Sequence, residues 1–265
     1  MSGGDEIRRS QEAIIERIRR AMALGVPSDS DRRRPFVTVT YAQSLDGSIA
    51  RHGGEKLMLS NLHSQQLTHR VRALHDAILV GINTVLSDDP QLNVRLVKGT
   101  NPQPVIVDSR LRFPLDARLL RDPCVRPIIA TGDQTACTEK ERRLAEQGAR
   151  VVRMPLEADG SLCLDRLLAY LWREGVRTVM VEGGSEILTS MLAAHLADQF
   201  LVTVAIRLVG GLRAVQPLAR AGEDPWPMLA NIDYEWLEGD LIIRGDLVHQ
   251  KARGMHSDAG QTAVP

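Results

Sequence analysis

The residues best suited to binding a ligand follow an apolar run at positions 177–181, which is predicted to form a strand. Glu182 ends this run, Gly183 and Gly184 come next, and a helical pattern begins at Ser185. Glycines let a ligand approach the backbone closely, and free N–H groups at a helix N-terminus attract phosphate. An acid at the carboxyl end of a buried strand stands where open α/β sheets place ligand contacts. The full GxGxxG pattern is absent, so a plain strand–helix turn is the alternative interpretation.

A second polar group lies between positions 80 and 96. Thr84 and Asp88 are four residues apart, so a short helix would turn both toward one side. The pair Asp89-Pro90 ends that helix, and Arg95 follows in an extended stretch. A hydroxyl, a carboxylate and a guanidinium together suit a polar, phosphorylated ligand. Helix capping with solvated charges is the alternative, because DDP is a common turn sequence.

Other catalytic patterns are missing from the chain. Its seven histidines show no HExxH or HxH spacing, which gives metal catalysis little support. There is no GxSxG, and no HxE followed by PCxxC, so neither a hydrolase elbow nor a zinc deaminase is predicted. The LDG sequence at 45–47 is predicted to be a turn, and a backbone contact from nearby Ala42 to a cofactor stays open.

The elements that must position these residues alternate between strands and helices. Apolar, β-branched runs predict strands at 36–42, 76–81, 104–108, 127–131, 150–154, 177–181 and 200–206. Helical patterns lie at 61–74, 83–87, 139–147, 165–174 and 186–195. Strands this apolar are buried on both faces, which predicts an α/β fold with a mostly parallel sheet covered by helices. Residues 234–248 predict an antiparallel hairpin around Gly239 at the edge.

Three segments are expected along the chain. Residues 1–34 form an N-terminal helix and linker, residues 35–249 one α/β domain, and residues 250–265 a disordered tail. The helix carries an apolar stripe made of Ile7, Ile14, Ile15, Ile18, Met22 and Leu24. It is expected to pack on the core or on a second subunit, and a partly ordered leader is the alternative.

Charge and composition exclude several classes of partner. Lys and Arg balance Asp and Glu at 33 each, and aromatic residues make up 3% of the chain. Binding of nucleic acid or of a membrane surface is therefore not expected. Three cysteines without a CxxC pair argue against a disulfide framework and for a reducing compartment. The charged N-terminal stretch lacks the apolar run of a signal peptide or anchor, so a cytoplasmic location is predicted.

Several segments together resemble one enzyme family. They are AQSLDGSIA, LTHRVRALHDAILVG, INTVLSDDPQLNVR, VDSRLRFPLDARLL, VEGGSEILTSML and a later VGG. They are similar, in the same order, to the reductase half of bacterial riboflavin-biosynthesis deaminase/reductases and to the standalone reductases of archaea and fungi. The resemblance runs from about residue 35 to 211.

The resemblance implies a dihydrofolate-reductase-like fold, a homodimer and NADPH as hydride donor. It implies reduction of the ribosyl C1′ of a 5-amino-6-(5-phosphoribosylamino)pyrimidine to the ribityl chain, with the base either deaminated or not. By motif matching, the cofactor positions are Ala42, Met58, Thr84, Asp88, Ser109 and the segment from Gly183, Gly184 and Ser185 to Ser190. The substrate positions are Lys56, Arg72, Leu92, Arg95 and Glu182, with Asp88 and Glu182 as catalytic candidates.

Two residues depart from the family pattern. Met58 stands where the bacterial fusion enzymes have tryptophan, and Lys56 where they have serine. Lys56 and Arg95 are expected to hold the 5′-phosphate, while Glu182 accepts hydrogen bonds from the pyrimidine. Two other functions stay open, since a fold hosts many activities: reduction of another pterin- or pyrimidine-like compound such as dihydrofolate, or a non-catalytic nucleotide-binding role.

Overall fold

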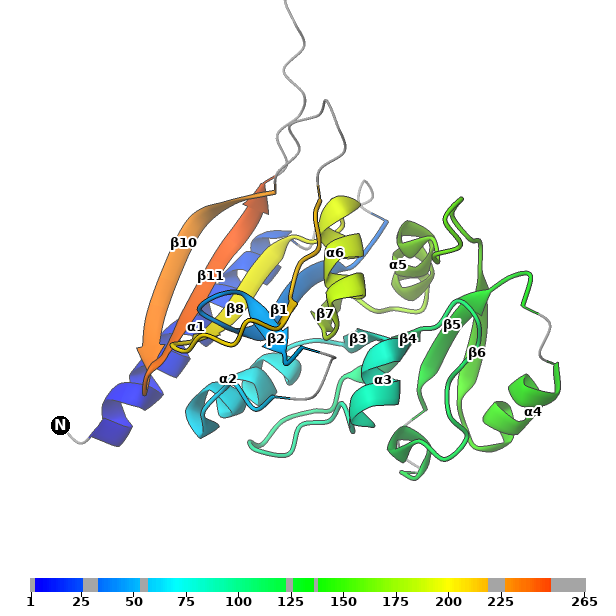
Figure 1. Ribbon diagram of the computed structural model, residues 1–265, viewed down its shortest axis with the longest axis horizontal. Helices are drawn as coiled ribbons and strands as arrows, with labels where there is room; N and C mark the ends of the chain where they lie inside the picture. Colours follow the sequence, from blue (N-terminus) through cyan, green and yellow to red (C-terminus); the bar gives the residue numbers. More distant parts are fainter. Residues whose placement is uncertain are drawn as a thin grey trace, which may run out of the picture.

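A nine-stranded sheet runs through the protein and carries helices on both faces (Figure 1). The structure is a computed structural model that describes residues 3–25, 33–52, 57–122, 126–135, 138–218 and 227–248. Most of the predicted linker, the loop with Lys56 and the predicted tail at 250–265 lie outside the described residues.

The strands of the sheet follow the order β10-β11-β8-β1-β7-β3-β4-β5-β6. Their bounds are β1 Phe36–Ser44, β3 Ala77–Gly81, β4 Gln103–Val107, β5 Ile128–Gly132, β6 Arg150–Met154, β7 Thr178–Glu182, β8 Gln199–Ala205, β10 Met228–Leu237 and β11 Asp240–Val248. All neighbours pair in parallel except β11, which is antiparallel to both β8 and β10. The predicted parallel sheet with an antiparallel edge is confirmed, although β10 begins six residues earlier than the hairpin predicted from position 234.

The apolar strands are buried because helices cover both of their faces. In β3, Ile78 and Val80 join one core and Ala77 and Leu79 the other. The helices are α1 Gly3–Gly25, α2 Leu62–Arg72, α3 Ile82–Asp88, α4 Thr138–Glu146, α5 Leu164–Arg173 and α6 Ser185–Ala193, with a 3-10 turn η1 at Arg118–Leu120. Asn61 caps α2 by accepting a hydrogen bond from the N–H of Ser64 at 3.0 Å.

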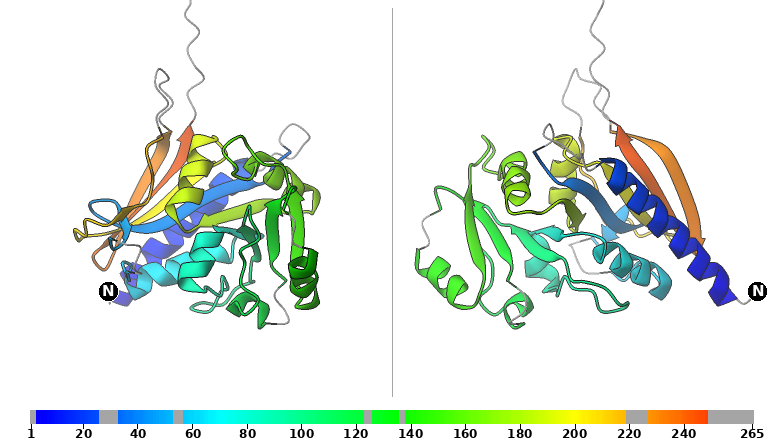
Figure 2. Two further views of the ribbon diagram at one scale, coloured as in Figure 1. Left: turned by 45° about the vertical axis from the view of Figure 1, so that its right-hand side comes forward. Right: turned by 180° about the vertical axis from the view of Figure 1, so that it is seen from behind.

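The N-terminal helix packs on the core of its own chain. Figure 2 shows α1 lying along the end of the sheet beside β10 and β11, and Ile14, Ile15 and Ile18 are buried there. They share a third core with Leu67 of α2 and Leu237 of β10, among others. Of the expected arrangements, packing on the core is therefore the observed one.

Leu24 was wrongly assigned to the apolar stripe, since its side chain is 86% exposed. It follows Met22 by two residues, a rotation of about 200°, which places it on the opposite side of a helix with 3.6 residues per turn. The apolar stripe thus ends at Met22, which is buried.

Candidate functional site

A cavity of about 750 Å³ opens where the parallel strands β1, β3 and β7 end. A smaller space of about 340 Å³ shares part of its wall, namely Arg72, Thr84, Asp88, Arg95, Glu182 and Gly183. This edge of the sheet is where open α/β folds bind ligands. The two polar groups predicted from separate stretches of sequence therefore meet in one place.

The strand–helix turn after β7 forms a glycine cradle against α3. Gly183 has φ +116°, and a Cβ there would lie 2.8 Å from the hydroxyl of Thr84. The N–H of Gly184 donates to that hydroxyl oxygen at 3.1 Å. No side chain caps α6 at Gly184, and Ser185 lines the cavity. The free N–H groups at this helix start suit the phosphates of a dinucleotide, so the residues fit such a cofactor.

Glu182 forms a two-bond ion pair with Arg72, which lies 110 residues earlier in the chain. Arg72 Nε and Nη2 donate to the two carboxylate oxygens at 2.6 and 2.7 Å. Burial opposes the charge of Arg72, but the attraction of Glu182 outweighs it and raises the pKa of the guanidinium. Glu182 is thus paired within the protein, a contact that the sequence analysis did not predict. Each oxygen keeps capacity for one further hydrogen bond.

A second arginine lies beside this pair. Asn93 bridges the two, because its carbonyl accepts from Arg72 at 2.9 Å and its amide oxygen accepts from Arg95 at 3.2 Å. Burial and the neighbouring charges of Arg72 and Arg118 lower the pKa of Arg95. Such crowding of cations around a single carboxylate creates a site that favours an added anion.

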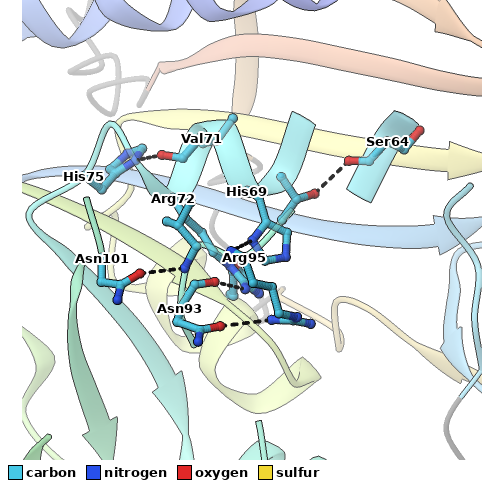
Figure 3. A network of polar contacts seen from close by, with 11 residues as sticks. Ser64, His69, Val71, Arg72, His75, Asn93, Arg95 and Asn101 are labelled. Carbon is cyan, nitrogen blue, oxygen red and sulfur yellow. Dashed lines mark hydrogen bonds and ion pairs between the residues drawn. The ribbon is translucent and has the colours of Figure 1, made fainter. Parts of the chain in front are cut away.

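His69 belongs to this cluster and was missed by the sequence analysis (Figure 3). It lies one helical turn before Arg72 on α2, and its Nδ1 accepts a hydrogen bond from the N–H of Arg95 at 3.1 Å. Burial, Arg72 and Arg95 together lower its pKa to about 4. The spacing His69-x-x-Arg72 would have placed both side chains on one face of the predicted helix.

The rim of the cavity is held by the predicted LDG turn. Asp46 accepts hydrogen bonds from the N–H groups of Val209 and Gly210 at 2.9 and 2.7 Å. The Ser44 hydroxyl and these two N–H groups keep the pKa of the Asp46 carboxyl below its usual range. This contact ties the loop after β8 to the turn between β1 and β2 (Ser48–Ala50), where Leu212 of β9 (Leu212–Arg213) lines the cavity.

Comparison with known proteins connects this site to a family. A model of the RibD C-terminal domain matches residues 35–225. The chain belongs to the RibD C-terminal domain family. It is 35% identical over 222 residues to a 2,5-diamino-6-ribosylamino-4(3H)-pyrimidinone 5′-phosphate reductase of Debaryomyces hansenii, covering 78% of this chain and 86% of the relative. The equally named protein of Archaeoglobus fulgidus is 37% identical over 188 residues, covering 67% of this chain and 83% of the relative.

Solved structures agree with the family. Acinetobacter baumannii RibD matches with a TM-score of 0.68 and 26% identity over 82% of this chain, which spans only 58% of that protein. Yeast Rib7, a riboflavin biosynthesis reductase, shares the fold with a TM-score of 0.65 and 24% identity over 83% of this chain and 93% of that one. The fold class and the resemblance inferred from the sequence are thus confirmed.

Most positions matched to the RibD family line these two spaces. The larger is lined by Ala42, Met58, Arg72, Thr84, Asp88, Arg95, Ser109, Glu182, Gly183, Gly184, Ser185 and Ser190. Leu92 lines the smaller space, where it is buried and adopts a left-handed backbone with φ 49°. Lys56 lies outside the described residues, so its contact with phosphate stays a prediction.

Two features are absent from the described part of this RibD-family chain. No group of three or more His, Cys, Asp or Glu side chains in that part is arranged to hold a metal ion. In the same ranges, no helix is both long and apolar enough to span a membrane.

Proposed function

We propose that this protein is an NADPH-dependent reductase that converts the ribosyl group of a 5-amino-6-(5-phosphoribosylamino)pyrimidine to a ribityl group. The observation that carries the proposal is the shared cavity. Its wall brings a glycine cradle at the start of α6 next to the cluster of Arg72, Arg95 and Glu182. A reductase must hold a dinucleotide and a polar substrate side by side, and the names of the fungal and archaeal relatives support this substrate class.

The cofactor would lie along α6 and α3. Gly183, Gly184 and the first turn of α6 would hold its phosphates, with Thr84 fixing the cradle. Ala42, Met58, Ser109 and Ser190 would contact the rest of it. When bound, NADPH supplies a hydride to C1′ of the opened sugar, and the protein supplies orientation and electrostatics. The choice of NADPH over NADH rests on the family resemblance.

The phosphorylated end of the substrate would lie against the arginines. Arg95 would contact the 5′-phosphate, and Arg72 would hold Glu182 in position to accept hydrogen bonds from the substrate. Leu92 would close the smaller space beside them. Asp88 lines both spaces. We assign to it the transfer of the proton at the sugar oxygen as the furanose opens.

The same family resemblance supports two further parts of the proposal. The protein would act as a homodimer, and it would act in the cytoplasm, since three cysteines without a CxxC pair suit a reducing compartment.

An absorbance assay of NADPH oxidation tests this function. The two forms of the phosphoribosylaminopyrimidine, with and without the second amino group, are compared with dihydrofolate. Turnover of either pyrimidine with little turnover of dihydrofolate is the expected result. Faster turnover of dihydrofolate would replace the proposed substrate. Binding of NADPH without oxidation in the presence of any of the three would indicate a non-catalytic nucleotide-binding protein.

A further inference from the structure

His69 is a buried polar side chain in the wall of the cavity, and no family motif used above assigns it a role. Only 3% of the residue is exposed, and it lines the larger cavity together with Arg72, Arg95 and Glu182. In Figure 3 its imidazole lies against Arg95 within the network that includes Arg72 and Asn93. A polar ring with so little exposure must either be satisfied by the protein or serve a ligand.

The hydrogen bond from Arg95 fixes the state of the ring. A backbone N–H can only donate, so Nδ1 of His69 must accept and cannot carry a proton. The ring is therefore neutral, with its proton on Nε2. This agrees with the lowered pKa of about 4, which burial, Arg72 and Arg95 cause against the opposing attraction of Glu182.

The Nε2–H group has no hydrogen-bond partner among the described residues. The buried side-chain atoms without a partner in the described part are Ser64 Oγ, Asp108 Oδ1 and Thr131 Oγ1. Nε2 of His69 is not one of them, so this unpartnered donor is accessible from the cavity. It shares the cavity wall with Arg72 and Arg95, whose positive charges attract an anionic oxygen.

We propose that His69 is a specificity-determining residue whose Nε2–H donates a hydrogen bond to a phosphate oxygen of the substrate. This rests on the proposed function. Arg72 and Arg95 supply charge, while His69 supplies a directed donor without adding a third positive charge to a crowded site. A donor fixed in its tautomer before binding loses little freedom when the ligand arrives.

His75 provides a matched control. It is a second buried histidine, three residues after the end of α2, but both ring nitrogens have protein partners: the carbonyl of Val71 at 2.8 Å and the hydroxyl of Thr38 at 2.9 Å. It does not line either cavity. A substitution there tests what the loss of any buried histidine does to the protein.

Two substitutions at position 69 separate the ring nitrogens. In His69→Asn the amide oxygen replaces Nδ1 as acceptor for Arg95 and the Nε2–H donor is lost. In His69→Gln the amide nitrogen reaches toward the place of Nε2. Since a hydrogen bond to a charged group is involved, His69→Asn should raise KM for the phosphorylated substrate about tenfold or more. Its kcat should change only a few-fold, because the phosphate charge is constant during the reaction.

Three comparisons complete the kinetic test. His69→Gln should recover part of the affinity, His75→Gln should keep the wild-type KM, and the dephosphorylated substrate should be affected little by His69→Asn. Equal losses with both substrates, or an unchanged KM in His69→Asn, would overturn the assignment. Wild-type turnover is the reference: a wild-type protein that does not reduce the pyrimidine refutes the proposed function instead.

A measurement without turnover tests the contact directly. Nitrogen-15 NMR of the histidine side chains in the full chain is followed while ribose 5-phosphate is added, with ribose as the control sugar. The Nε2 signal of His69 should shift with ribose 5-phosphate and not with ribose, while both signals of His75 stay in place. No shift of His69 at saturation would refute the proposal.

Discussion

At the scale of single residues, the site depends on which polar groups are already paired. Glu182 has two hydrogen bonds from one guanidinium, so its orientation is set before a ligand binds. An arginine fork matches a carboxylate in two parallel bonds, which a lysine cannot do. Glu182 is partly buried, so the loss of this partner should also lower the stability of the protein.

We therefore expect Arg72→Lys to raise KM for the phosphorylated pyrimidine at least tenfold and to lower thermal stability. The lysine keeps the charge but cannot hold both carboxylate oxygens of Glu182. Steady-state kinetics and thermal unfolding measure the two effects. Arg142→Lys is the control, because Arg142 pairs with Glu139 in the same way but on an exposed helix. Equal KM values for wild type and Arg72→Lys would contradict the role of the fork.

The buried His75 makes stability depend on pH. Burial lowers its pKa to about 4, from 6.5 in an ordinary environment. Below pH 6.5 the unfolded chain binds a proton that the folded chain does not take up until about pH 4. The contribution of neutral His75 to the free energy of unfolding is therefore fully present above pH 6.5. It is lost progressively as the pH falls toward 4.

At pH 5 this single group should cost about 2 kcal/mol of unfolding free energy relative to pH 7.5. Urea unfolding at both pH values is compared for wild type and His75→Gln. The decrease between pH 7.5 and 5 should be smaller in the variant by about that amount. The same decrease in both proteins would mean that His75 titrates near its ordinary pKa.

At the scale of elements, the contact between α3 and the start of α6 shapes the cofactor site. Gly183 combines a backbone that other residues rarely adopt with an approach to Thr84 that a Cβ would block. Gly184 adds the N–H group that bonds Thr84. Gly183 is therefore the glycine that lets the two elements meet this closely, whereas a Cβ at Gly184 would lie 3.4 Å from the Thr84 hydroxyl.

Gly183→Ala should weaken NADPH binding at least tenfold, because the added methyl group forces Thr84 and the first turn of α6 apart. Fluorescence titration measures the affinity. Gly148→Ala is the matched control: it has a similar positive φ of 88°, but nothing lies within 4 Å of its Cβ position, and it does not line the cavity. That variant should lose some stability and keep its affinity for NADPH. If both variants bind NADPH like wild type, the cradle does not hold the cofactor.

At the scale of the whole molecule, one end of the sheet is covered on one face only. Glu235 of β10 accepts from Ser10 of α1 at 3.1 Å, so alternate residues of this strand point away from the helix. Among these are Tyr234 and Trp236, which are 68% and 55% exposed. In Figure 1 no helix of the described chain crosses this face of β10 and β11. Exposed aromatic residues in one patch are typical of an interface.

We expect a homodimer that buries this face against a second copy. Because the apolar side of α1 already packs on its own chain, this helix is not needed for the contact between the two subunits. Sedimentation at micromolar concentration should give about twice the 29.3 kDa of the monomer. The paired substitution Tyr234→Glu with Trp236→Glu should give a folded monomer, whereas Leu24→Glu, on the exposed side of α1, should remain dimeric. A monomeric wild-type protein would refute this expectation.

The sequence alone determined the local patterns of this protein. Continuous apolar runs such as 76–81 identified buried parallel strands, and the glycine pair after Glu182 identified the turn into α6, because these features depend on neighbouring residues. Only the tertiary structure decided which groups meet. Arg72 pairs with Glu182, which lies 110 positions later in the chain. The hydrogen bond from the N–H of Arg95 to Nδ1 fixes the tautomer of His69. Such contacts depend on the order of strands in the sheet and on the direction of each side chain, which no local pattern encodes.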